Sequence, residues 1–191
     1  MAGRVRQHDS EERIVAAALA LFDERGFGQV TMEEIAAAAD VSRRTVYRKF
    51  PTKGHVVLAV PQRWLGAWDD AVRALGEARP LDAAEAGCLA VASYIDSHPS
   101  EVMTAYAALA ESPTLESAGT SNGQWIARIV ALLEREPKPV ASAMQHIVAG
   151  AYLGAIDAMM MCWVSSGGAG SVLTQTERVL ERLRPAWPTS T

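Results

Sequence analysis

The chain has 191 residues, of which 49% are hydrophobic, enough to bury one substantial core or two smaller ones. Alanine is abundant and strand-like alternation of Val, Ile and Thr is missing, so we predict an all-α fold of about nine helices and exclude a β-sheet architecture. The formal net charge of −4 argues against a protein that binds nucleic acid over its whole surface, but residues 41–53 contain five Lys or Arg and no acid.

The first predicted helix begins at Asp9 or Ser10 and ends at Gly26, whose glycine suits a helix end. Its apolar residues recur at helical spacing and form one stripe, at Ile14, Ala18, Leu21 and Phe22. We interpret this helix as a brace for the segment that follows. The first thirteen residues contain no apolar run, so we expect no secretory signal and a cytoplasmic protein.

Residues 31–50 have the pattern of a helix-turn-helix motif. Thr31 is placed to cap a first short helix, with Glu34 reaching back in a capping box. The corner falls at residues 39–41, where Asp40 can adopt the left-handed backbone that a tight turn requires. Ser42 is then placed to cap the second helix.

The second helix of this motif has one narrow apolar side and an otherwise cationic surface. Val46 and Phe50 share the apolar side, and the remaining positions are Arg43, Arg44, Thr45, Tyr47, Arg48 and Lys49. Guanidinium groups can read guanine edges, and hydroxyl and ammonium groups can contact phosphates. The alternative is a solvated basic face on an ordinary surface helix, but the caps, corner and basic helix occur in the order expected of a DNA reader.

The segment from Arg13 to Lys53 resembles the TetR family of bacterial transcriptional regulators. The resemblance rests on RIVAAALALFDERGF, VTMEEIAAAADVS and TVYRKFPTK. It implies a three-helix DNA-binding domain followed by a larger helical domain that binds an effector and dimerises, with repression relieved by the effector. It also implies that Lys53 contacts the DNA backbone. The chain departs from the family pattern at the corner, where Asp40 replaces a frequent glycine.

We therefore predict a DNA-binding domain at residues 1–53, bound to double-stranded DNA through a near-palindromic operator. The second helix and its cap at Ser42 are expected to enter the major groove. Base or nearby contacts are expected from Arg43, Arg44, Thr45 and Tyr47, and phosphate contacts from Thr31, Arg48, Lys49 and Lys53.

Residues 54–191 are predicted to form a helical bundle that binds an effector and dimerises. A long helix should run from Lys53 towards Glu77, with a kink or break near Val60 because Pro61 removes a backbone hydrogen bond. Further helices are predicted at about 81–98, 100–111, 114–136, 137–164 and 172–184.

Aromatic and methionine side chains of this bundle are candidates for a small-molecule effector site suited to an apolar or aromatic ligand. The set comprises Trp64, Trp68, Tyr94, Met103, Tyr106, Trp125 and Met161, together with Asp157, which could bind a cationic ligand or a buried hydrogen-bond network. Plain core packing is the alternative for each member.

The helix at 139–164 and the last helix carry small and apolar residues at helical spacing, which predict a four-helix interface of a homodimer. The candidates are Ile147, Gly150, Ala151, Gly154, Ala158, Val172, Val179 and Leu183, with internal packing as the alternative. Gln145, His146 and Asp157 would be costly in lipid, so we interpret residues 139–164 as a buried helix of a soluble protein and expect no membrane partner.

A rival hypothesis makes the body an enzyme or a carrier. The four histidines lack metal-ligand spacing, and neither a nucleophile elbow nor a glycine-rich phosphate loop is found, so we predict no catalytic residue, metal or cofactor. A third hypothesis keeps the DNA chemistry but makes the protein an activator, or a regulator without an effector.

Overall fold

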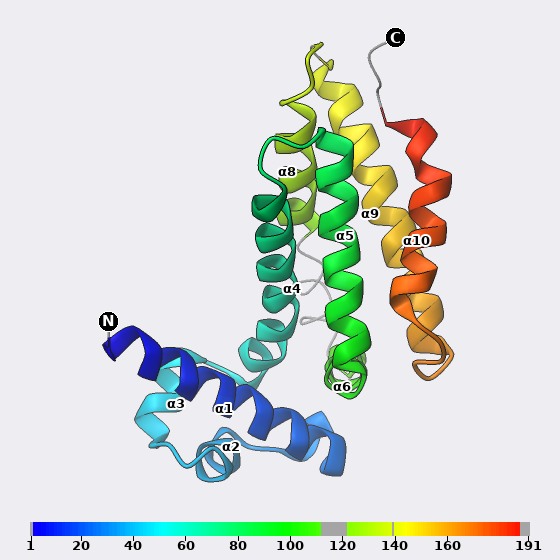
Figure 1. The fold of residues 1–191 in the computed structure, drawn as a ribbon. Helices are drawn as coiled ribbons and strands as arrows, with labels where there is room; N and C mark the ends of the chain where they lie inside the picture. The colour runs from blue at the N-terminus through cyan, green and yellow to red at the C-terminus, as the bar shows by residue number, and fades with distance from the viewer. Residues whose placement is uncertain (1, 112–121, 139, 188–191) are drawn as a thin grey trace. The chain divides into compact units, whose positions relative to one another are not determined.

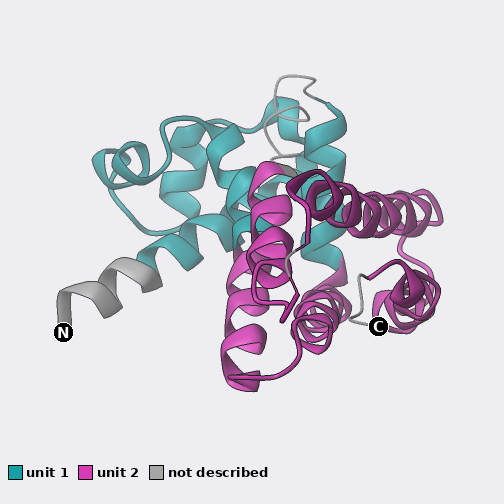
Figure 2. Cartoon of the chain, turned by 90° about the horizontal axis from the view of Figure 1, so that it is seen from above, with its two compact units in different colours: residues 1–62, 100–120 teal, residues 63–99, 121–191 magenta. Residues whose placement is uncertain are grey.

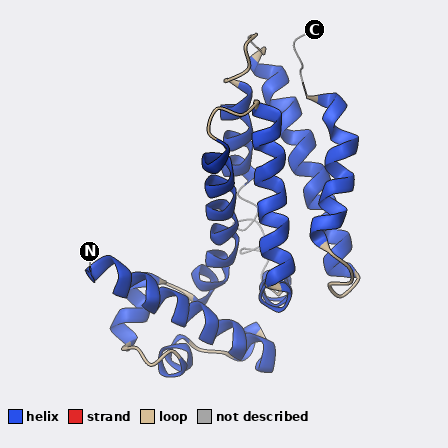
Figure 3. Cartoon of the chain, viewed as in Figure 1, coloured by secondary structure: helices blue, strands red, loops and turns tan. Residues whose placement is uncertain are grey.

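The computed structural model describes residues 2–111, 122–138 and 140–187, and the side chains of residues 2–9 and 122 are not among them. The described residues form nine α-helices and two short 3₁₀ helices, without a β-strand (Figure 3). The predicted all-α class is confirmed.

The chain divides into two compact units (Figure 2). Unit 1 comprises residues 1–62 and 100–120, and unit 2 comprises residues 63–99 and 121–191. The boundary that we predicted, between residues 53 and 54, stays a prediction. The structural division differs from it because residues 100–120 group with the N-terminal part of the chain.

Unit 1 contains α1 (Ala2–Arg25), η1 (Phe27–Gln29), α2 (Met32–Ala38), α3 (Arg43–Lys49) and α6 (Pro99–Ala110) (Figure 1). Helix α1 begins well before the predicted start at Asp9 or Ser10. Three residues of its predicted stripe, Ile14, Ala18 and Phe22, are buried in the core, as are Ile35 of α2 and Val46 of α3; α1 packs on α2, and α2 packs on α3. Burial of this stripe holds the two short helices, which are too short to be stable alone.

Helix α4 (Lys53–Leu75) is continuous through Pro61, so a break near Val60 is wrong, and the alternative of a kink stays a prediction. A proline inside a helix removes one backbone hydrogen bond. Buried side chains flank it on both sides, at Val57, Val60 and Leu65, and their burial offsets that loss. The division between the units passes through this helix, between Gln62 and Arg63.

Unit 2 is a bundle of α5 (Pro80–Ser97), α8 (Asn122–Leu133), α9 (Ser142–Ser165) and α10 (Val172–Leu183) with the end of α4, and closes with η2 (Arg184–Ala186). Helix α10 packs on α5 and α9, and α8 packs on the same two helices. The core is apolar and includes Trp68, Ala84, Leu133, Tyr152 and Leu180.

Polar side chains fix the ends of this bundle. Asp96 of α5 accepts hydrogen bonds from the backbone N–H groups of Val172 and Leu173, at 2.7 and 3.2 Å, and so caps α10. A bidentate pair joins Arg184 to the nearly buried carboxylate of Glu85, at 2.9 and 2.7 Å. The start of α10 and the turn after it are therefore both tied to α5.

Helix α9 is the segment for which the sequence raised the question of a membrane span. It is long and apolar enough to cross a membrane, although core helices of soluble proteins pass the same test. It begins at Ser142, five residues after the predicted start at Pro137, and only 33% of its most apolar window is buried within the chain. The predicted burial of this helix is therefore only partial in the single chain, because one side of α9 faces solvent.

Candidate nucleic-acid interface

The helix-turn-helix has the caps and the corner that its sequence predicts. Thr31 and Glu34 form a complete capping box, and the Ser42 hydroxyl accepts a hydrogen bond from the backbone N–H of Thr45 at 3.1 Å. Asp40 has φ of +51°, the left-handed conformation that the corner requires. Arg13 of α1 donates to the carbonyl oxygens of Ala39 and Asp40 at 2.5 and 3.1 Å, so α1 braces the corner directly.

Four side chains form the exposed cationic face of α3: Arg43, Arg44, Tyr47 and Arg48. Val46 and Phe50 are buried on the opposite side of the helix, which fixes this face outward. Among the described residues, Arg44 and Arg48 have no side-chain partner, whereas Arg43 and Tyr47 contact Glu33 of α2. A short exposed helix with three guanidinium groups and a phenol matches the residue types that read base edges and phosphates.

Two of the predicted contact residues on α3 are less available than we expected. Only 6% of the Lys49 side chain is exposed, and its ammonium pairs with Glu11 of α1 at 3.4 Å, so its phosphate role stays a prediction. The helical period places Lys49 towards α1, on the side away from Arg44. Thr45 is half-buried, and its hydroxyl is hydrogen-bonded to that of Ser42 at 2.8 Å. Thr45 therefore takes part in the cap.

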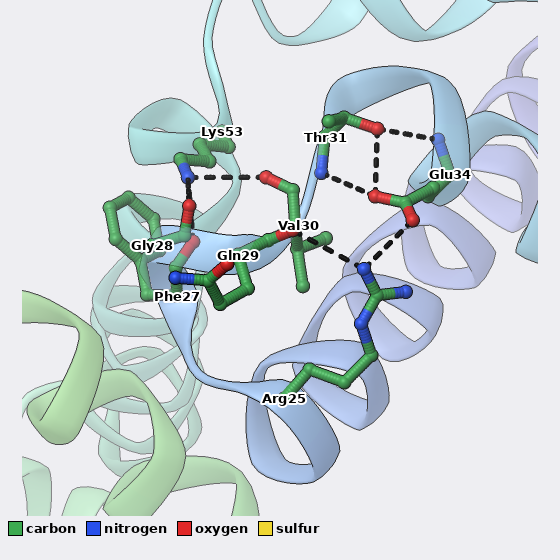
Figure 4. A network of polar contacts seen from close by, with 8 residues as sticks. All are labelled: Arg25, Phe27, Gly28, Gln29, Val30, Thr31, Glu34 and Lys53. Carbon is green, nitrogen blue, oxygen red and sulfur yellow. Dashed lines mark hydrogen bonds and ion pairs between the residues drawn. The ribbon is translucent and has the colours of Figure 1, made fainter.

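Lys53, at the start of α4, is also used within the chain (Figure 4). Its ammonium donates to the carbonyl oxygens of Phe27, Gly28 and Val30 at 2.6, 3.2 and 3.1 Å and lies 4.4 Å from the centroid of the Phe27 ring. An ammonium has three donors, and all three are directed at backbone oxygens. Within the chain Lys53 therefore anchors the η1 turn, and its phosphate contact stays a prediction.

Only Val30 separates η1 from Thr31, the N-cap of α2, so the anchor at Lys53 also positions the start of α2. On the other side of the turn, the carboxylate of Glu111 accepts a hydrogen bond from the backbone N–H of Gly28 at 3.0 Å. Arg25 donates to the carbonyl oxygen of Gln29 at 3.3 Å and pairs with Glu34 at 2.8 Å (Figure 4). The first turn of α2 is therefore positioned by α1, α4 and the end of α6 together.

We expect Lys53→Met to lower the free energy of unfolding by about 1–2 kcal/mol, because three carbonyl oxygens lose a charged donor while the aliphatic stem is retained. Urea unfolding followed by circular dichroism measures this change. Arg178→Met, at an exposed cation of unit 2, serves as the control and should unfold like the wild type. Wild-type stability of Lys53→Met would contradict the anchoring role.

The capping box depends on the charge of Glu34. Hydrogen bonds from the backbone N–H and hydroxyl of Thr31, together with Arg25, lower the pKa of Glu34 to about 2. Because the folded pKa is depressed, this stabilisation is fully present above the unfolded glutamate pKa of about 4.3 and is lost as pH falls towards 2. The motif is thus fully capped at neutral pH.

In unit 2, the predicted effector residues Trp68 and Trp125 lie together. Their rings pack edge to face with centroids 5.9 Å apart, and Trp68 is buried in the core. The Trp68 ring lies directly against Gly87 of α5, where a Cβ atom would approach ring carbons to 2.5 Å. A glycine at this position therefore makes the slot that the indole fills.

The other predicted effector residues are distributed over both units. Trp64 and Tyr94 are half-buried in unit 2, and Tyr94 stacks on His98 with ring centroids 4.2 Å apart. Met103 and Tyr106 belong to unit 1. Asp157 and Met161 are exposed on α9, which corrects their assignment to an interior site, because their helical positions coincide with the outward face of that helix.

Sequence reasoning missed two features of unit 2. A cleft of about 500 Å³ lies at the end of the bundle and is lined by Leu81, Trp187 and polar residues that include Arg79 and Arg135, but by none of the predicted effector residues. The hydroxyl of Tyr152 is fully buried and has no hydrogen-bond partner among the described residues, and burial raises its pKa. Single aromatic residues in a helical pattern carry no signal for either feature.

The exposed side of α9 holds most of the predicted dimer residues. We define the outer α9 face as the exposed residues that share one side of the helix: Ala143, His146, Ile147, Gly150, Gly154, Asp157, Ala158 and Met161. Ile147 is 62% exposed, and Ala151 lies at the edge of this face. Val179 and Leu183 are half-buried on α10. Val172 is buried in the core of the chain, so its assignment to the interface is corrected.

Metal-ligating side chains do not gather in the described part of the chain. Among the described residues, no group of three or more His, Cys, Asp or Glu is placed to hold a metal ion.

Comparison with known proteins finds relatives along the chain. A family model described as bacterial regulatory proteins of the tetR family matches residues 14–60. The HTH-type transcriptional regulator EthR of Mycolicibacterium smegmatis is 30% identical over 133 residues. The match covers 67% of this chain and 61% of that protein, so the chain spans less than two thirds of this relative.

Two solved structures share the fold over nearly the whole chain. FadR of Thermus thermophilus, a transcriptional repressor in complex with lauroyl-CoA, has a TM-score of 0.67 at 22% identity and covers 95% of this chain and 96% of its own. SmeT of Stenotrophomonas maltophilia, in complex with triclosan, has a TM-score of 0.71 at 18% identity, with coverages of 95% and 92%. At these identities the likeness concerns the fold.

Proposed function

Since the chain belongs to the TetR family of bacterial regulatory proteins, we propose that it is a homodimeric transcriptional repressor that a small-molecule effector releases from DNA. The observation that supports this most strongly is the exposed cationic face of α3, held outward by its buried apolar side. Each protomer would insert this helix into the major groove of one half of a near-palindromic operator.

The DNA contact proposed for each residue depends on whether its side chain already has a partner within the described part of the chain. Arg44 is the strongest candidate for reading a guanine, because its guanidinium is exposed and has no partner in the described part of the chain. Arg48 is a candidate for phosphate contact for the same reason. Arg43 and Tyr47 would read bases from the positions in which Glu33 holds them. Lys49 and Lys53 support this arrangement from within the domain.

Pairing of two protomers through the outer α9 face supports this function in two ways. It covers an apolar helix face that is exposed in the single chain, and burial of such a face is favourable. It also doubles every DNA contact, and a single short helix that reads three or four bases cannot discriminate one site in a genome.

The effector is proposed to be an apolar or aromatic molecule that binds inside unit 2. The paired indoles of Trp68 and Trp125 offer aromatic contact, and the buried hydroxyl of Tyr152 lacks a partner in the described structure. Two proteins of the same fold were crystallised with lauroyl-CoA and with triclosan, both of which have large apolar parts. An effector that prefers one arrangement of the body would shift the population that binds DNA.

Selection of duplexes from a random DNA library by the purified protein tests the DNA-binding proposal. We expect a near-palindromic sequence to be enriched and its affinity to fall steeply with salt. Arg44→Ala should reduce discrimination at one base pair of each half-site by about 10-fold or more, because a bidentate guanine contact contributes about 1–3 kcal/mol.

Arg178→Ala provides the matched control, since it removes the same charge from the exposed side of α10 in unit 2. It should leave both affinity and sequence preference close to wild type. Selection of no duplex by the wild-type protein would contradict the proposed function. Unchanged preference in Arg44→Ala would contradict only the assignment of that residue.

A further inference from the structure

Glu33, the second residue of α2, places a carboxylate on the exposed cationic face of α3. One of its oxygens accepts from two side chains of that face, because Oε1 forms an ion pair with the Arg43 guanidinium and lies 3.2 Å from the Tyr47 hydroxyl, which donates to it. The Glu33 side chain is 40% exposed. Half of the four residues that face outward from α3 are therefore held by a single acid.

The side-chain caps of the motif do not include this acid. The cap of α2 is formed by Thr31 and Glu34, and the cap of α3 is formed by Ser42, so Glu33 takes part in neither. Glu33 accepts a hydrogen bond from its own backbone N–H in the first turn of α2, and its contacts with Arg43 and Tyr47 are exposed, where ion pairs contribute little to stability. The contacts with Arg43 and Tyr47 therefore act on the DNA-facing side chains more than on the stability of the motif.

The charge of Glu33 opposes simple attraction to DNA. A hydrogen bond from its own backbone, together with Arg43 and Tyr47, holds the pKa of Glu33 below its usual range, so the carboxylate is ionised at neutral pH. An ionised carboxylate repels phosphates and occupies a guanidinium that could otherwise neutralise one. This lowers affinity for any duplex, whatever its sequence.

We propose that Glu33 is a specificity-determining positioning residue, which holds Arg43 and Tyr47 in one arrangement and weakens binding to non-cognate DNA. This inference rests on the proposed function. Two long side chains that are fixed before binding lose less rotamer entropy when they meet the correct base edges. A duplex that offers only phosphates gains nothing from that arrangement and meets the repulsion. Specificity is a difference between these two affinities.

Glu33→Gln tests the proposal, since it keeps the size of the side chain and removes the charge. The probes are the duplex that the wild-type protein selects from a random library and a shuffled duplex of the same base composition. We expect affinity for the shuffled duplex to rise about 3- to 10-fold at low salt, and the plot of log affinity against log salt to steepen by about one per protomer as each Arg43 becomes free to neutralise a phosphate. The ratio of the two affinities should fall about 10-fold or more.

Glu24→Gln is the matched control, because Glu24 is an exposed acid of the same unit and does not contact α3 among the described residues. It removes the same charge and should change neither the affinity ratio nor the salt slope beyond a small, uniform gain. Equal effects of the two substitutions would overturn the proposal and reduce the role of Glu33 to net charge.

Tyr47→Phe keeps the proposal testable if Glu33→Gln unfolds. It removes the hydroxyl that Glu33 holds without changing α2, and we expect it to lower the affinity ratio by several-fold. Where Glu33→Gln folds, the double variant should show a non-additive effect. A Glu33→Gln variant with the wild-type ratio and salt slope would overturn the proposal while the proposed function stands. Loss of preference confined to one cytosine would also overturn it, since that result indicates a direct base contact. Failure of the wild type to select any duplex would remove the proposed function itself.

Discussion

Replacing Gly87 by alanine is expected to destabilise the protein by a net of about 2 kcal/mol. The added Cβ would lie 2.5 Å from two ring carbons of Trp68, which is too close for any relaxed contact. Overpacking of this kind costs about 3 kcal/mol, and the higher helix propensity of alanine returns about 1 kcal/mol. The midpoint of urea unfolding, with an unchanged slope, measures the difference.

Gly66→Ala is the control for Gly87→Ala, because Gly66 also lies inside a helix and a Cβ atom added there would meet no other atom within 4 Å. It should stabilise the protein by up to about 1 kcal/mol through helix propensity alone. A smaller ring should relieve the clash, so Trp68→Phe is expected to cost less in the Gly87→Ala background than in the wild type. If Gly87→Ala were as stable as Gly66→Ala, Trp68 would not occupy this slot.

Placing charges on the outer α9 face is expected to separate the proposed dimer into monomers. The double substitution Ile147→Glu and Gly154→Glu would bring four carboxylates into one interface, where burial without partners is strongly unfavourable. Each monomer would bind DNA through a single copy of α3, so we expect affinity for the selected duplex to fall at least about 100-fold. Analytical ultracentrifugation and mobility-shift titration measure the two effects.

Leu75→Glu controls for the general effect of adding an acid to an exposed apolar position. Leu75 is 42% exposed at the end of α4 and is not part of the outer α9 face. This variant should keep the mass of the wild-type assembly and its DNA affinity. A dimer that persists in the double variant would show that the subunits pair through another surface.

Local chemistry made the helix-turn-helix predictable from the sequence. Thr31, Glu34 and Ser42 act on backbone groups at most three residues away, and Asp40 adopts a conformation that few residues tolerate. Helical periodicity likewise placed Val46 inside and Arg44 outside. In each case the determining interaction lies within about one helical turn.

Roles that depend on distant partners could not be predicted in the same way. A lysine next to a basic helix suggests phosphate binding, but Lys53 meets carbonyl oxygens more than twenty residues earlier in the chain, and Lys49 meets Glu11 on another helix. The α9 pattern showed which residues share a face, but not whether that face is covered by the chain itself. Asp157 was therefore assigned to the interior although it lies on the outside.

The attachment of α6 to the N-terminal helices has a consequence for engineering. Glu111 holds the backbone N–H of Gly28, and the buried hydroxyl of Thr104 donates to Asp23 at 3.2 Å, so residues near position 100 complete a structure that begins at position 2. A chimera made by joining residues 1–62 to a foreign sensor would lack both bonds. To transfer the DNA-sequence specificity of this protein to another regulator, two separate segments would therefore have to be moved together, the N-terminal segment and α6.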